Sequence, residues 1–158
     1  MFHCLAARRA RFSLRSPVIF MIIGVFIRFI FIVTLPSMKI VKRVLPSGLI
    51  VVVVPMTESV SVTVDVSVRT GSFYENKQIN GISHFLEHMC FKGTKKRPHM
   101  GQIMRELEEI GAQANASTGN EITSYYVTAL PHHLDTVLDV VSDVYLNSTF
   151  PVEEIEKE

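Results

Sequence analysis

The sequence predicts one mixed α+β domain, and two repeating patterns carry that prediction. From Val60 to Val68, valine occupies every second position, with Ser, Thr or Asp between. This alternation gives a β-strand one apolar and one polar face, whereas a helix would scatter the valines. From Met100 to Ile110, apolar residues recur three or four positions apart and Gly111 follows, which is typical of an amphipathic helix ended by glycine. A chain of 158 residues that is 47% hydrophobic can bury the core of one such domain.

Two further strands are expected before the valine strand. Residues 40–45 and 49–54 flank the turn residues Pro46-Ser47-Gly48, which predicts a strand, a short turn and a second strand. The second of these strands is apolar throughout, so we expect burial on both of its faces. A polar loop over 71–80 follows the valine strand.

A helix is expected after Gly81. Asn80 or Ser83 is the expected cap at its start, and Gly93 with Thr94 ends it. The segment that follows is interpreted as a solvated loop with four basic side chains: Lys92, Lys95, Lys96 and Arg97.

The second half of the chain continues with strands and then helices. Residues 114–129 predict a strand, a turn and a strand, with Tyr125 and Tyr126 on opposite faces. A third helix follows Pro131, and Pro151 opens a fourth. In the third helix we expect the apolar residues to face the core (Leu134, Val137, Leu138, Val141 and Tyr145) and the acidic ones to face solvent (Asp135, Asp139 and Asp143). His132 and His133 are interpreted as a polar helix entry rather than as metal ligands.

Charge divides the chain into a leader, 1–37, and a domain, 38–158. Eight basic residues and no acidic residue precede Glu58, whereas acidic residues outnumber basic ones from Glu58 onward. The net charge of +1 is therefore the sum of a basic leader and an acidic body, the domain that follows it. Nothing in the acidic body suggests nucleic acid as a partner. The two cysteines lie far apart in the sequence and imply no disulfide framework.

Three interpretations of the leader stay open. Residues 1–16 are rich in Arg, and 18–35 are apolar apart from Arg28 and a few small or hydroxylated residues. A signal anchor would give a membrane contact through 18–35 and place the domain outside, although Arg28 in mid-span would be costly. A mitochondrial transit peptide fits the Arg and Ser content but not the long apolar run. Translation from Met38 would leave a cytoplasmic chain without the leader, so the sequence does not fix the localisation.

The strongest chemical signal is His84-Phe85-Leu86-Glu87-His88. On a helix, the two histidines lie one turn apart on one face, where two imidazoles can share a single zinc ion. Glu87 falls on the same face, and a carboxylate there can accept a proton from zinc-bound water and so generate a nucleophile. The order H-x-x-E-H is the inverzincin signature. Zinc is the metal these donors suit best, although other divalent ions bind similar sites. Cys90 turns away from this face and is interpreted as a small apolar filler.

With these residues placed, the chain from Lys39 to Glu158 resembles the pitrilysin-type (M16) zinc metallopeptidases, which include the insulin-degrading and mitochondrial-processing peptidases. Several separate segments match in the family's order: GSFYE at 71–75, NGISHFLEHM at 80–89, FKGT at 91–94, Asn115-Ala116, and TSYY at 123–126. The resemblance implies an α+β fold in which an antiparallel sheet carries helices packed on one face. That fold agrees with the order of strands and helices expected above.

The resemblance also implies roles for individual residues. His84 and His88 match the ligands of one zinc ion, and Glu87 matches the general base. Asn115 and Ala116 match edge-strand positions that pair with the backbone of an extended peptide or unfolded protein substrate. The implied activity is that of a zinc endopeptidase.

The resemblance further implies that the zinc site is incomplete in this chain. The family's third zinc ligand is a glutamate that would follow Glu158. Glu158 itself resembles an acid about two turns before that ligand, on the same helix face. We therefore expect an amino-terminal fragment that binds zinc weakly and cleaves little by itself, and that needs a carboxy-terminal half or a partner subunit to complete the site.

Two other functions stay open. A non-catalytic relative would keep the fold and the edge strand as a peptide-binding or assembly subunit. Such a subunit, however, has no chemical reason to retain both histidines and Glu87. A membrane-anchored structural module would use residues 18–35 instead.

Overall fold

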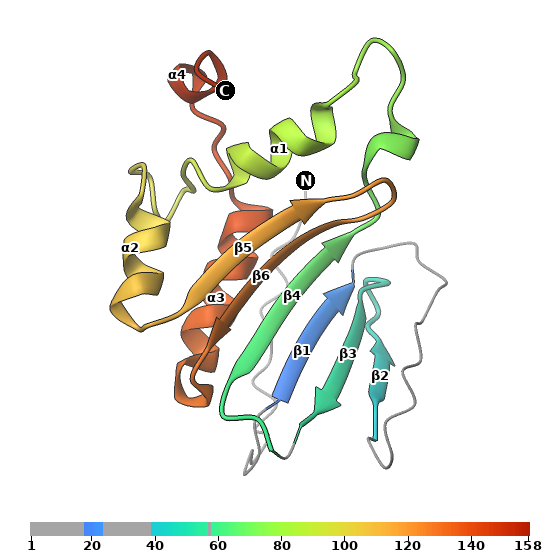
Figure 1. Ribbon diagram of the computed structural model, residues 1–158, viewed down its shortest axis with the longest axis vertical. Coiled ribbons are helices and arrows are strands. Elements are labelled where there is room, and N and C mark those ends of the chain that lie inside the picture. Colours follow the sequence, from blue (N-terminus) through green and yellow to red (C-terminus); the bar gives the residue numbers. More distant parts are fainter. Residues whose placement is uncertain (1–17, 24–38, 57) are drawn as a thin grey trace.

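The computed structural model describes residues 18–23, 39–56 and 58–158, and it contains a six-stranded sheet with the order β2-β3-β1-β4-β6-β5 (Figure 1). The strands are β1 (Val18–Ile23), β2 (Val41–Val44), β3 (Ile50–Pro55), β4 (Val62–Val68), β5 (Gln113–Thr118) and β6 (Thr123–Ala129). Neighbouring strands pair antiparallel except β1 and β4, which pair parallel.

Part of the apolar leader segment lies in this sheet. β1 is hydrogen-bonded between β3 and β4. The remainder of 18–35, together with 1–16 and Met38, lies outside the described residues, so the three interpretations of the leader stay predictions. Among the residues that the structure describes, no helix is both long enough and apolar enough to cross a membrane.

The helices confirm the predicted α+β arrangement. α3 (Leu134–Leu146) packs against β4 and β6, while α1 (Ile82–Cys90) and α2 (Gln102–Glu109) contact β5. Figure 1 shows α3 behind the sheet and α1 crossing above the end of β5. α4 (Val152–Ile155) is a single turn, and two 3-10 turns cover Ser72–Tyr74 and Pro131–His133.

The core lies between α3 and the part of the sheet that contains β4 and β6. Alternate residues of both strands are buried, so Tyr125 faces the core while Tyr126 is half-buried on the other face, as predicted. Each fully buried valine contributes roughly 1.5–3 kcal/mol relative to an exposed one. The core cluster contains Val64, Val66, Cys90, Ile103, Leu107, Tyr125, Val127, Ala129, Val137, Val140, Val141 and Val144.

The prediction that the apolar strand over 49–54 is buried on both faces was wrong. All six residues of β3 are only half-buried. β3 lies next to the edge strand β2. α3 packs against β4 and β6, which lie toward the opposite edge of the sheet. A continuous apolar run therefore marks a strand here without marking a doubly covered one.

Two predictions about charged side chains were also wrong. Arg97 was expected in a solvated loop and Asp143 on a solvated helix face, yet both are buried. Nη1 of Arg97 donates to Oδ2 of Asp143 at 2.8 Å, and the guanidinium also binds Glu106 of α2 and Asp139 of α3. A guanidinium can be buried when carboxylates satisfy its donors, and that pairing depends on tertiary contacts. Tyr145, expected to face inward, is 39% exposed.

Candidate metal centre

The helix that carries the histidines begins with a cap from a distant side chain. The carboxylate of Glu75 accepts hydrogen bonds from the backbone N–H of Gly81 at 2.7 Å and from that of Ser83 at 2.9 Å. These bonds hold the pKa of Glu75 below its ordinary value, because they favour the ionised form. Asn80 and Ser83, the predicted caps, make no such side-chain bond. Glu75 instead satisfies two of the free donors at the start of α1.

One turn into α1, the two histidines converge. The Nε2 atoms of His84 and His88 lie 2.9 Å apart, and their rings meet edge to face with centroids 4.5 Å apart. Two nitrogens on one tetrahedral zinc lie about 3.4 Å apart, given Zn–N bonds of about 2.0–2.1 Å. The two imidazoles therefore suit a shared zinc ion after a shift of about half an ångström.

Glu87 completes the cluster from the buried side of α1. Ligand atoms of His84, Glu87 and His88 all lie within 4.8 Å of one another, and within the described ranges no other group of three or more His, Cys, Asp or Glu side chains is placed to hold a metal ion. Both histidines are exposed, whereas Glu87 is 9% exposed. Its Oε2 accepts a hydrogen bond from Oγ1 of Thr118, the last residue of β5. The carboxylate therefore lies between the histidines and the edge of the sheet.

Glu158 approaches the other side of His88. Its Oε1 contacts Nδ1 of His88, and its Oε2 binds Nζ of Lys92 at 2.7 Å. Lys92 and then His88 lower the pKa of Glu158 from its ordinary value. A carboxylate at Nδ1 orients an imidazole and leaves Nε2 as the nitrogen for a metal.

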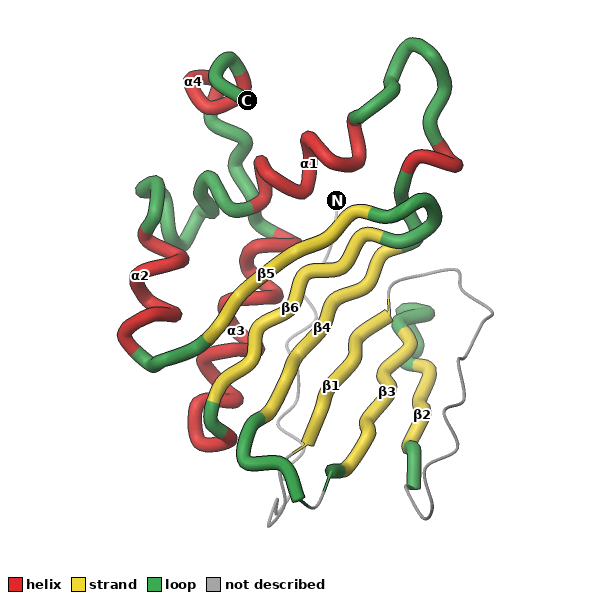
Figure 2. Tube along the Cα trace, in the orientation of Figure 1, coloured by secondary structure: helices red, strands yellow, loops and turns green. Residues whose placement is uncertain are grey.

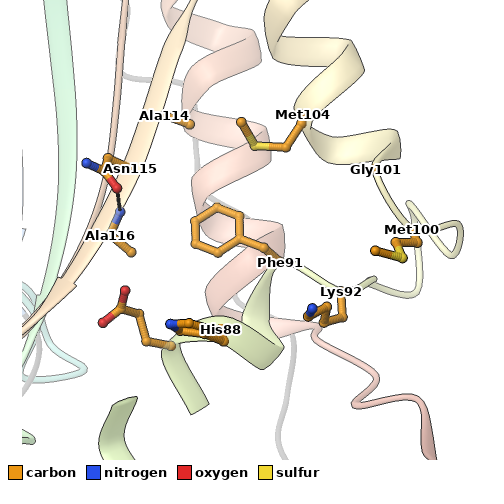
Figure 3. Close-up of a pocket in the computed structure, with 10 residues that line it drawn as sticks. His88, Phe91, Lys92, Met100, Gly101, Met104, Ala114, Asn115 and Ala116 are labelled. Carbon is orange, nitrogen blue, oxygen red and sulfur yellow. Dashed lines mark hydrogen bonds between the residues drawn. The ribbon is translucent and has the colours of Figure 1, made fainter. Parts of the chain in front are cut away.

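An apolar pocket of about 410 Å³ adjoins Glu87 and His88. In Figure 3, the ring of Phe91, the residue after α1, lies below Ala114 on β5 and Met104 on α2. The other residues that line this apolar pocket are Lys92, Met100, Gly101, Asn115 and Ala116.

A second pocket, of about 520 Å³, adjoins the same cluster on the side of the β5–β6 turn. Its lining is more polar: it includes His84, Glu87, Ala116 and Thr118, together with Ser72, Glu75, Asn80, Gly81, Ser117, Gly119 and Asn120. Both pockets therefore open beside Glu87, and Ala116 lines both.

Asn115 and Ala116 lie on β5, the strand at one edge of the sheet (Figure 2). The backbone N–H of Ala116 donates to Oδ1 of Asn115 at 2.9 Å, which means that a local side chain satisfies it rather than the ladder to β6. An outward N–H of this kind is what an added strand would bind.

Two other candidates play no part in this cluster. Cys90 is buried in the core cluster on the opposite side of α1, as its interpretation as an apolar filler requires. The rings of His132 and His133, before α3, are tilted by 48° with centroids 4.0 Å apart, and they belong to no group of metal-binding side chains in the part of the chain that the structure describes.

Sequence reasoning missed three residues that shape the site. Thr118 binds Glu87, Glu75 caps α1, and Arg97 anchors the segment after α1. Glu75 stood within the matched segment 71–75, but nothing local indicated its partners. The bonds formed by Thr118 and Arg97 join residues 31 and 46 positions apart, beyond the reach of any local pattern.

Comparisons with known proteins point in the same direction. The model of the family described as "Insulinase (Peptidase family M16)" matches residues 51–158. The chain is 46% identical over 114 residues to an uncharacterized zinc protease of Rickettsia felis, a match that covers 72% of this chain and 27% of that protein. It is 47% identical over 96 residues to mitochondrial-processing peptidase subunit beta of Caenorhabditis elegans, covering 61% of this chain and 21% of that one.

A solved structure matches as well. The crystal structure of a protease from Helicobacter pylori superimposes with a TM-score of 0.70 at 31% identity, over 74% of this chain and 28% of that chain. The present chain thus spans about a quarter of the length of these relatives.

Proposed function

The chain belongs to the insulinase family of peptidases, peptidase family M16, and on that premise we propose that it forms the metal-binding and peptide-binding part of a zinc endopeptidase. One observation carries the proposal. Two imidazole nitrogens 2.9 Å apart and a buried carboxylate converge beside β5, the last strand of the sheet among the described residues. This convergence supports a function that combines metal ligands, a base and a peptide-binding strand.

Each residue of the cluster has a distinct duty in this proposal. His84 and His88 hold one zinc ion through Nε2. When bound, zinc supplies a Lewis acid that makes water nucleophilic near neutral pH. Glu87 accepts the proton of the attacking water and returns it to the leaving amine nitrogen. Because Oε2 of Glu87 is held by Thr118, Oε1 is the oxygen that takes the proton.

The two edges of the sheet support β5 as the peptide-binding strand. β2, at the far edge, carries Lys42 and Arg43, and charged side chains hinder pairing with another strand. β5 has no charged residue over Gln113–Thr118. An extended peptide that pairs at Asn115 and Ala116 would lie directly beside Glu87.

The two pockets suit the side chains of such a peptide. Successive side chains of an extended strand point in opposite directions, and those two residues apart share a face. An apolar side chain fits the pocket formed by Phe91, Met104 and Ala114, while the second pocket offers polar contacts. The substrate class is therefore an extended peptide or an unfolded protein segment.

We propose that the metal takes a third protein ligand from outside the described residues. Catalytic zinc sites ordinarily use three protein ligands, and His84 and His88 supply two. Further residues of the polypeptide or a partner subunit would supply the third. Glu158 then acts through His88, by holding its Nδ1.

A non-catalytic binding subunit is the alternative. One relative is named as a subunit of a peptidase, which makes an assembly role reasonable. Glu87 argues against this alternative. A carboxylate buried beside two histidines can act as the base in hydrolysis, whereas in a subunit that only binds peptide its burial would cost stability without a catalytic use.

The test is hydrolysis of fluorogenic peptides by the product of the complete gene, with zinc, after chelation, and after zinc is restored. Glu87→Gln is expected to lower kcat by about 10²–10⁴-fold, the usual contribution of a general base. The same variant should keep its affinity for zinc, which separates a base from a ligand. His132→Ala serves as the matched control and should leave hydrolysis unchanged. Undiminished hydrolysis by Glu87→Gln would refute the proposal.

A further inference from the structure

We propose that Thr118 is a positioning residue that fixes the orientation of the Glu87 carboxylate; this rests on the proposed function of Glu87 as a base. Oγ1 of Thr118 donates a hydrogen bond to Oε2 of Glu87. The direction is set by chemistry, because an ionised carboxylate only accepts. The bond therefore fixes the position of Oε2 and with it the orientation of the carboxylate.

Glu87 needs such a partner because of where it lies. It is 9% exposed, and a carboxylate withdrawn from water is costly to leave without a donor. Thr118 is the one hydrogen-bond donor to this carboxylate among the described residues. Without the hydroxyl, the long glutamate side chain would be free to rotate its carboxylate away from the histidines.

Thr118 is itself held from behind by Thr123. The two residues face each other in the β5–β6 ladder, and Oγ1 of Thr123 lies 3.4 Å from Oγ1 of Thr118. Thr123 is completely buried, and its Oγ1 also lies 3.3 Å from the carbonyl oxygen of Thr70, two residues after β4. With Thr123 fixed behind it, Thr118 keeps one rotamer, and the hydroxyl of Thr118 stays directed at Glu87.

The turn after Thr118 is clamped by the loop over 71–75. The backbone N–H of Phe73 donates to the carbonyl of Asn120 at 2.9 Å, and Oγ of Ser72 donates to its side chain at 2.9 Å. At Gly71 the backbones approach so closely that a Cβ would lie 2.3 Å from the carbonyl oxygen of Gly119. Only glycine fits there.

The same loop ends in Glu75, which caps α1. One short segment thus fixes both partners of the Thr118–Glu87 contact: the turn that carries Thr118 and the helix that carries Glu87. The matched segment 71–75 therefore has a structural role. In addition, Thr118 belongs to β5, so the strand proposed to bind the peptide also orients the proposed base.

Two substitutions at Thr118 test the proposal through catalysis. Thr118→Val keeps the shape and removes the hydroxyl, whereas Thr118→Ser keeps the hydroxyl. In the complete gene product, Thr118→Val should lower kcat by about 10- to 100-fold, as loss of an orienting partner does, with KM unchanged. Thr118→Ser should restore most of the rate. Thr63→Val, which removes a hydroxyl pair with Thr128 at the far end of β6, is the matched control and should leave kcat unchanged.

A second measurement tests the contact without using activity. Urea unfolding of Thr118→Val, Glu87→Ala and the double variant forms a double-mutant cycle. We expect the midpoint shift of the double variant to be smaller than the sum of the two single shifts, while Thr63→Val and Glu87→Ala should add.

The outcomes separate the two proposals. Additive shifts, or a Thr118→Val variant that keeps the full kcat, would overturn the role of Thr118. If the parent protein hydrolyses no peptide while the cycle is non-additive, the proposed function fails and the positioning of Glu87 by Thr118 stands.

Discussion

Two groups of ionisable side chains, one around Arg97 and one around His84 and His88, differ in how many of their polar atoms are paired within the group. In one group, the buried Arg97 binds carboxylates of Glu106, Asp139 and Asp143. In the other, His84 and His88 are exposed beside two pockets, and their Nε2 atoms face each other.

The difference shows what each group does. The Arg97 guanidinium donates four hydrogen bonds to three carboxylates, so the Arg97 group connects α2 and α3 to the loop between α1 and α2 and offers little to a ligand. Two imidazole nitrogens directed at one point form the arrangement that we propose a metal ion occupies. The charges of the Arg97 group satisfy one another and connect elements of the fold, whereas the histidine pair is the proposed metal site.

The largest effect on stability is expected from breaking the satisfied group. Arg97→Met removes the cation and leaves Asp143 buried without its charge partner, which should lower the free energy of unfolding by about 3–5 kcal/mol. Urea unfolding measures the loss. A change below about 1 kcal/mol would show that the group contributes little to the fold.

Acid should weaken the same group. The hydrogen bond from Arg97 lowers the pKa of Glu106 against the effect of burial. Burial raises the pKa of Asp139 and that of Asp143, but hydrogen bonds outweigh it and lower both: those of Arg97 and then Lys96 at Asp139, and those of Thr94 and then Arg97 at Asp143. Groups with a lowered folded pKa stabilise the fold above their unfolded values of about 4, and that stabilisation is lost as pH falls through the folded pKa.

The urea midpoint of the parent chain should therefore fall as pH drops below about 4. Arg97→Met should show a shallower fall, because its carboxylates have lost the partner that lowers their pKa. Identical pH profiles for the two proteins would contradict this explanation.

The smallest effect is expected at the rim of the satisfied group. Nζ of Lys96 binds Asp139 at 2.6 Å, but the lysine side chain is 59% exposed, so water screens the pair. Lys96→Ala should change the free energy of unfolding by about 0.2–1 kcal/mol. A loss of unfolding free energy as large as that of Arg97→Met would show that solvent exposure does not explain the different contributions of Lys96 and Arg97 to stability.

The contrast also explains what could be predicted from the sequence. His84, Glu87 and His88 lie within one turn, so helical geometry alone brings them together. The valine alternation likewise fixed β4, because strand patterns are local. Arg97, Thr118 and Glu75 depend on partners from other elements, and a basic residue in a Lys-rich run carries no sign of the acids that will surround it.

Strand burial escaped prediction for a related reason. β3 is apolar throughout but half-buried, since what covers a strand is decided by where the helices pack. The edge position of Asn115 and Ala116 came from family resemblance, and the structure places both on β5 at the sheet edge.

The proposed metal site is tested most directly by a metal titration of this chain, followed by cobalt(II) absorption and competition with zinc. We expect one metal ion per chain, with affinity lowered by about 100-fold in His84→Ala and in His88→Ala and unchanged in His132→Ala. Equal affinity in all four proteins would show that the converging imidazoles are not the metal site.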